Sequence, residues 1–102
     1  MLEADLLDGI LRVARLYGWR SAHFRPARTA HGWRTPVGGD GKGWPDLFLV
    51  RPPRLLVVEL KSDKGKVEPD QRRWLEDLAA CGVEVHVWRP QDLEEAARIL
   101  AR

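Results

Sequence analysis

The stretch from Asp46 to Lys61 reads DLFLVRPPRLLVVELK. It holds two runs dense in β-forming residues, 46–50 and 55–61, separated by the Pro-rich segment 51–54. Two such runs around a short turn predict a pair of strands joined as a hairpin. We therefore expect this hairpin to form the centre of a sheet.

The segments around the hairpin predict a small α/β domain. Helical spacing or alternation of apolar residues identifies five of them: helix 2–17, strand 21–25, helix 68–81, strand 83–88 and helix 91–101. The predicted order is α-β-β-β-α-β-α in a single domain, 1–102, with a small mixed sheet flanked by helices. The helix 68–81 would cross between two parallel strands, 55–61 and 83–88.

The stretch 26–44 contains five Gly and shows no periodicity, so we expect a long loop there. A loop of this length in a small domain more often has a function than not.

The composition of the chain narrows the class of protein. The chain has no apolar run long enough to span a membrane, begins with an acidic segment unlike a secretory signal, and carries a single cysteine, Cys81. These features fit a protein of a reducing cytoplasm.

The net charge of +2 conceals an uneven distribution along the chain. Residues 12–66 carry a net charge of +8, whereas 1–11 and 67–102 each carry −3. A basic block of this kind indicates an anionic partner, with nucleic acid as the first candidate. The alternative is that these cations are ordinary solvated surface residues without an anionic partner, which a GC-rich genome encodes as Arg.

Three charged residues interrupt the apolar pattern of the hairpin. Glu59 and Lys61 are two apart on one strand and share a face, and Asp46 can lie opposite them on the adjacent strand. Two converging carboxylates favour a hard divalent cation such as Mg²⁺ between them, and a neighbouring ammonium can position a water molecule. The alternative is that these charged residues simply lie in solvent at the rim of the sheet, where strands end. Against it, Glu59 directly follows four apolar residues, where an unpaired charge would be costly to bury.

The same residues resemble a known family. Pro45-Asp46 and Glu59-Leu60-Lys61, with 12 residues between the acids, are similar to the PD-(D/E)xK nuclease signature. The wider series resembles a small stand-alone VRR-NUC domain; it comprises Gly43-Trp44-Pro45-Asp46-Leu47, Glu59-Leu60-Lys61-Ser62 with Gly65, Pro69-Asp70-Gln71 and Val87-Trp88-Arg89-Pro90. The phage members of this family resemble Holliday-junction resolvases, which implies the cytoplasm of a bacterium or of a phage-infected host.

The resemblance implies roles for individual residues. Asp46 and Glu59 would bind Mg²⁺ or Mn²⁺ together with the main-chain carbonyl of Leu60, and Lys61 would orient or activate the attacking water. Gln71 corresponds to the family's additional polar residue at the catalytic site, with helix capping as the alternative. Glu3 matches an acid that reaches the metal directly or through water. Its rivals are Asp5 and Asp8, and all three acids could instead be ordinary partners of the helix dipole.

The implied function is a metal-dependent endonuclease that hydrolyses DNA phosphodiester bonds, preferentially in branched DNA such as Holliday junctions. Two symmetric cuts in a junction would require a homodimer. The candidate contacts to backbone phosphates are Arg25, Arg28, Arg34, Lys42, Lys64 and Lys66. Three alternatives stay open: a flap- or restriction-type nuclease of the same fold, a catalytically silent DNA-binding module, and an α/β interaction protein without a nucleic-acid role.

Overall fold

The computed structural model describes residues 3–24, 27–29, 32–34 and 37–102, with the backbone alone for 27–29 and 32–34. Its helices are α1 (Glu3–Leu16), α2 (Pro69–Ala80) and α3 (Leu93–Ala101), the last preceded by a 3-10 turn at Pro90–Asp92. Its strands are β1 (Arg20–His23), β2 (Ala27–Thr29), β3 (Gly32–Arg34), β4 (Leu47–Arg51), β5 (Arg54–Leu60) and β6 (Glu84–Trp88). No helix among these residues is long and apolar enough to cross a membrane.

The main sheet has the strand order β1-β4-β5-β6. The first two pairings are antiparallel and the pairing of β5 with β6 is parallel. The predicted hairpin, the predicted parallel pair and the predicted α/β fold with a small mixed sheet are therefore confirmed.

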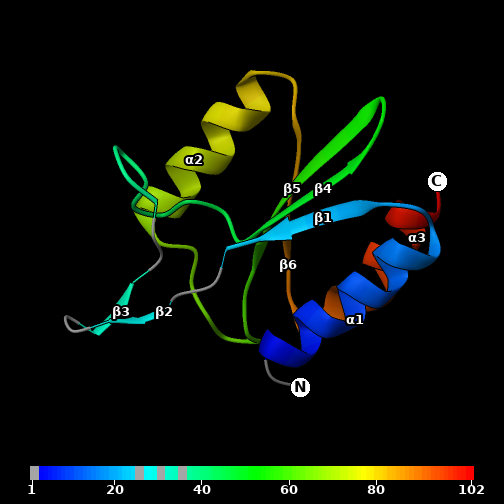
Figure 1. Ribbon diagram of the computed structural model, residues 1–102, viewed down its shortest axis with the longest axis horizontal. Helices are drawn as coiled ribbons and strands as arrows, with labels where there is room; N and C mark the ends of the chain where they lie inside the picture. The colour runs from blue at the N-terminus through cyan, green and yellow to red at the C-terminus, as the bar shows by residue number, and fades with distance from the viewer. Residues whose placement is uncertain (1–2, 25–26, 30–31, 35–36) are drawn as a thin grey trace.

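The helices cover the two faces of the sheet unequally. Figure 1 shows α2 on one side of the sheet and α1 and α3 on the other. Because side chains alternate along a strand, β5 divides its residues between these sides. Leu56, Val58 and Leu60 are buried in the core formed with α1 and α3, so Val57 and Glu59 point toward the side of α2. One strand thus supplies residues both to the main core and, through Glu59, to the predicted site of Asp46, Glu59 and Lys61.

The stretch 26–44 differs from the predicted loop. It contains β2 and β3, which pair with each other in antiparallel fashion and extend away from the main sheet (Figure 1). Strands of three residues are too short to produce a visible alternation in the sequence. The expectation of a segment without secondary structure was therefore wrong for this part of the stretch.

Candidate active site

The register of the hairpin brings the two predicted carboxylates together. Leu47 of β4 pairs with Val58 of β5, so Asp46, one residue earlier, lies opposite Glu59, one residue later. The backbone amide of Leu60 donates a hydrogen bond of 2.8 Å to Oδ2 of Asp46. This bond orients the Asp46 carboxylate toward the end of β5.

Glu59 is buried with an incomplete set of partners. The residue is 2% exposed, and Nζ of Lys61 lies 3.5 Å from its Oε2. Its other oxygen, Oε1, is buried and accepts no hydrogen bond from any described residue. A buried carboxylate oxygen without a partner is costly, so ionised Glu59 would be stabilised by a further positive or hydrogen-bonding group.

The ionisation of the two acids points to the same requirement. Burial, followed by the negative charge of Asp46, raises the pKa of Glu59 to about 8, although Lys61 opposes the shift. Burial also raises the pKa of Asp46, against the hydrogen bond from Leu60, and the charge of Glu3 adds to that rise. Both acids therefore resist ionisation without a cation, and a hard divalent ion would compensate their charge.

Of the three N-terminal acids, the structure brings Glu3 into electrostatic range of the site. After burial, its charge contributes to the raised pKa of Asp46, whereas Asp5 and Asp8 are exposed on α1. In the described part of the chain, no three His, Cys, Asp or Glu side chains gather closely enough to hold a metal ion. Direct coordination by Glu3 therefore stays a prediction, and the candidate metal ligands that the structure brings together are the carboxylates of Asp46 and Glu59.

Gln71 has the capping geometry that was its alternative interpretation. Its Oε1 accepts a hydrogen bond of 2.9 Å from the backbone amide of Glu68, at the start of α2. The glycine of the motif, Gly43, packs against this same turn with a φ of +85°, and a Cβ there would lie 2.6 Å from the carbonyl carbon of Asp70. Only glycine combines this φ with such a close approach. A direct role of Gln71 in catalysis stays a prediction.

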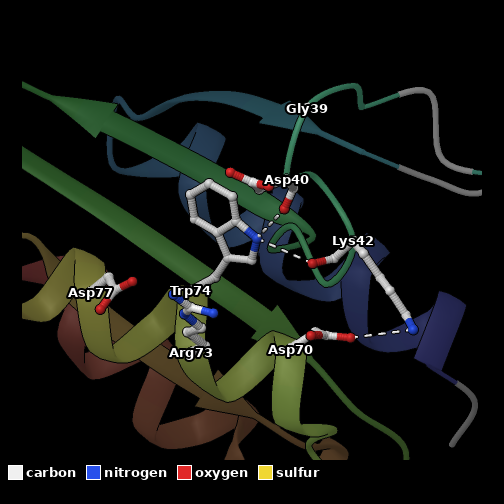
Figure 2. A pocket seen from close by; sticks show the side chains of 7 residues that line it. All are labelled: Gly39, Asp40, Lys42, Asp70, Arg73, Trp74 and Asp77. Carbon is white, nitrogen blue, oxygen red and sulfur yellow. Dashed lines mark hydrogen bonds and ion pairs between the residues drawn. The ribbon is translucent and has the colours of Figure 1, made fainter.

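The segment leading into Asp46 is fastened to α2 by Trp74. Its indole Nε1 donates to the carbonyl oxygens of Asp40 and Lys42, at 3.1 and 3.2 Å. Figure 2 shows these bonds together with the ion pair of 3.4 Å between Lys42 and Asp70. The Trp74 ring also contacts Trp44 edge-to-face, at 4.9 Å between centroids. Trp74, which was not identified as a site residue from the sequence, thus holds the backbone that precedes Asp46.

The predicted DNA contacts fall into three groups. Arg25 lies outside the described residues, and Arg28 and Arg34 lie in β2 and β3, whose side chains are likewise outside them. Lys42 is highly exposed and paired with Asp70. The remaining two, Lys64 and Lys66, are exposed and line one cavity.

That cavity also contains two arginines that sequence reasoning missed, Arg72 and Arg89. Arg72 lies in the first turns of α2, shortly after the loop that carries Lys64, whereas Arg89 follows β6 and is 25 residues from Lys64. The crossover that brings β6 next to β5 is therefore what adds Arg89 to these cations.

Two comparisons with known proteins bear on the chain as a whole. The family model of the VRR-NUC domain matches residues 20–92. This match includes Asp46, Glu59, Lys61 and Gln71, and it excludes Glu3. A comparison with curated proteins finds no match.

Proposed function

The chain belongs to the VRR-NUC domain family, within the PD-(D/E)xK nuclease superfamily, and from this premise we propose that it is a divalent-metal-dependent endonuclease acting on branched DNA. The family indicates a nuclease-type function. The proposal adds Mg²⁺ or Mn²⁺ as cofactor, the four-way junction as preferred substrate and a homodimer as the active form. A dimer would place two catalytic sites on one junction and allow two symmetric cuts.

The observation that carries the proposal is the buried Oε1 of Glu59, which has no hydrogen-bond partner among the described residues and lies beside Asp46 and Lys61. Oxygen ligands of this type suit a hard divalent cation, which Asp46, Glu59 and the Leu60 carbonyl would hold. When bound, such a cation stabilises the negative charge that develops on the phosphate and lowers the pKa of the attacking water.

The residues of the chain supply the remaining steps. The Leu60 amide keeps the Asp46 carboxylate in a single orientation, so little reorganisation is needed when the substrate binds. The Lys61 ammonium lies 3.5 Å from Glu59 and would hold the water in line with the scissile P–O bond. Attack by this water forms a new P–O bond, breaks the bond to the leaving oxygen, and transfers a proton to that oxygen.

The direct test is to incubate the protein with a synthetic four-way junction, a flap and a plain duplex, each with Mg²⁺ or Mn²⁺. We expect cleavage that is fastest on the junction and is lost in EDTA. Equal cleavage of all three substrates would remove the junction preference alone, and no cleavage of any substrate would overturn the nuclease assignment.

Lys61→Ala separates catalysis from binding in this experiment. We expect the variant to lose cleavage by about a hundredfold or more while retaining most of its affinity for the junction. Retained cleavage would show that Lys61 does not position the water. Light scattering after size exclusion tests the dimer, and a monomer of 11.7 kDa would contradict it.

A further inference from the structure

A basic cavity lies beside the candidate active site, on the loop that follows Lys61. It has a volume of about 420 Å³. Four cations line it, Lys64, Lys66, Arg72 and Arg89, against a single acid, Asp63. The cavity thus has a local excess of positive charge that can attract an anion.

Arg89 shapes the cavity by holding the loop. Its Nη1 donates to the carbonyl oxygens of Ser62 and Gly65, at 2.8 and 2.6 Å. The loop follows Lys61 directly and closes on itself, because the Gly65 amide donates to Oγ of Ser62 at 3.1 Å. The cavity and Lys61 are therefore carried by the same short segment of chain.

The other cations of the cavity are available to a ligand. Among the described residues, none of Lys64, Lys66 and Arg72 forms an ion pair, whereas Lys42, Arg54 and Arg98 each pair with a carboxylate. Three unpaired cations around one cavity repel each other, so an anion bound between them would be stabilised. Arginine in particular can offer two parallel N–H donors to the oxygens of a phosphate.

We propose that this cavity binds a backbone phosphate of the cleaved DNA strand, next to the phosphate attacked at Asp46, Glu59 and Lys61. The inference rests on the proposed nuclease function and adds Arg72 and Arg89 to the DNA contacts. By anchoring one neighbouring phosphate, the cavity would fix the register of the strand over the metal ligands. Contacts to phosphate carry no sequence information, which agrees with an enzyme that recognises DNA structure.

Arg72 and Arg73 provide a matched pair of variants for the test. They are adjacent on α2, but Arg73 lines a different cavity, with Asp40, Asp70 and Asp77 (Figure 2). Binding of a labelled four-way junction is measured by fluorescence anisotropy in EDTA over a series of KCl concentrations. We expect Arg72→Ala to weaken binding about tenfold. The slope of the logarithm of the binding constant against the logarithm of the KCl concentration should also become shallower by about one. Arg73→Ala should change both quantities much less, and equal effects of the two variants would overturn the proposal.

A second measurement identifies the phosphate without altering the protein. Junctions that each carry one neutral methylphosphonate linkage, at successive positions from the cleavage site, are titrated with wild type and with Arg72→Ala. We expect one position at which the neutral linkage weakens wild-type binding and leaves the variant unaffected. The absence of such a position would contradict a backbone-phosphate site. Inorganic phosphate that binds with dependence on Arg72, without any effect of the variant on DNA affinity, would assign the cavity to a free anion instead.

The two proposals fail separately in these experiments. If wild type binds DNA with the expected dependence on Arg72 but cleaves nothing in Mg²⁺, the nuclease function falls, and the cavity stands as a binding site for a DNA backbone phosphate without a neighbouring cleavage site. If wild type cleaves and Arg72→Ala binds and cleaves like wild type, the phosphate site alone falls.

Discussion

The Leu60 amide donates a hydrogen bond of 2.8 Å to Oδ2 of Asp46, and this bond ties the start of one strand to the end of its neighbour. It gives the Asp46 carboxylate two functions that substitutions can separate. The oxygen that accepts the bond is structural, whereas the negative charge would serve the metal. Asparagine keeps the first function and removes the second.

Asp46→Asn is expected to keep or raise the melting temperature in EDTA, because the amide retains the acceptor for Leu60 and removes a charge that opposes the ionisation of Glu59, and to reduce cleavage by at least about a hundredfold. Asp46→Ala should reduce cleavage equally and also destabilise the fold by about 1–3 kcal/mol, because the Leu60 amide loses its acceptor. Thermal unfolding and a cleavage assay on the same preparations measure both effects. Equal melting temperatures for the two variants would show that the hydrogen bond contributes little to stability.

The metal-free protein should become less stable as the pH rises through the neutral range. Burial and the charge of Asp46 raise the pKa of Glu59 from 4.5 to about 8 in the folded state. The native protein therefore holds a proton that the unfolded chain releases, and stability falls between about pH 4.5 and pH 8. We expect a loss of about 1 kcal/mol or more over this window, or about 4–8 °C in melting temperature. Melting curves in EDTA at several pH values would measure it.

Two variants show whether Glu59 causes this slope, the fall in melting temperature with rising pH. Glu59→Gln should flatten the slope, because the amide does not titrate. Glu84→Gln should leave it in place: hydrogen bonds with His86 and Arg54 lower the pKa of Glu84 despite the opposing effect of burial. A lowered pKa removes stability as the pH falls, below the window in question. A slope that persists in Glu59→Gln would assign it to other groups.

Addition of Mg²⁺ at pH 8 should raise the melting temperature of the wild type, because the cation binds the folded state and compensates the two carboxylates. At a concentration of about 100 times Kd the gain is about 2.7 kcal/mol. Without metal, Glu59→Gln should be more stable than the wild type at this pH. Addition of Mg²⁺ should not raise the melting temperature of this variant. Glu84→Gln serves as control and should respond like the wild type. A full Mg²⁺ response in Glu59→Gln would place the metal elsewhere.

Gly43→Ala should destabilise the protein more than Gly82→Ala, although both glycines have nearly the same φ, +85° and +86°. At Gly82 the added Cβ meets open space, so the cost is that of the left-handed backbone, about 1–2 kcal/mol. At Gly43 it would also collide with the backbone of Asp70 and Gln71, which must separate α2 from the loop. Urea unfolding of the two variants gives the comparison, and equal midpoints would contradict this packing.

Much of the fold was predictable because its signals are local. Alternation and helical spacing identify elements within about ten residues, and the strands around 46–61 were placed to within one residue. The hairpin of β2 and β3 was missed because strands of three residues carry no such signal. Gln71 was ambiguous for a different reason, since a glutamine in the first turn of a helix has the same pattern whether it caps the helix or faces a substrate.

The sequence alone determined the α/β class and the shared face of Glu59 and Lys61, because spacing along a strand decides which side chains lie on one face. The family and the candidate roles of Asp46, Glu59 and Lys61 came from the resemblance of the motif series to the VRR-NUC domain. Only the tertiary structure showed that Glu59 Oε1 is buried with no hydrogen-bond partner in the described part of the chain, that Trp74 holds the backbone before Asp46, and that Arg72 and Arg89 join Lys64 and Lys66 in one cavity. Burial, partners and cavities arise from contacts between segments that are distant along the chain. The order of residues does not specify such contacts until the sheet and helices have packed.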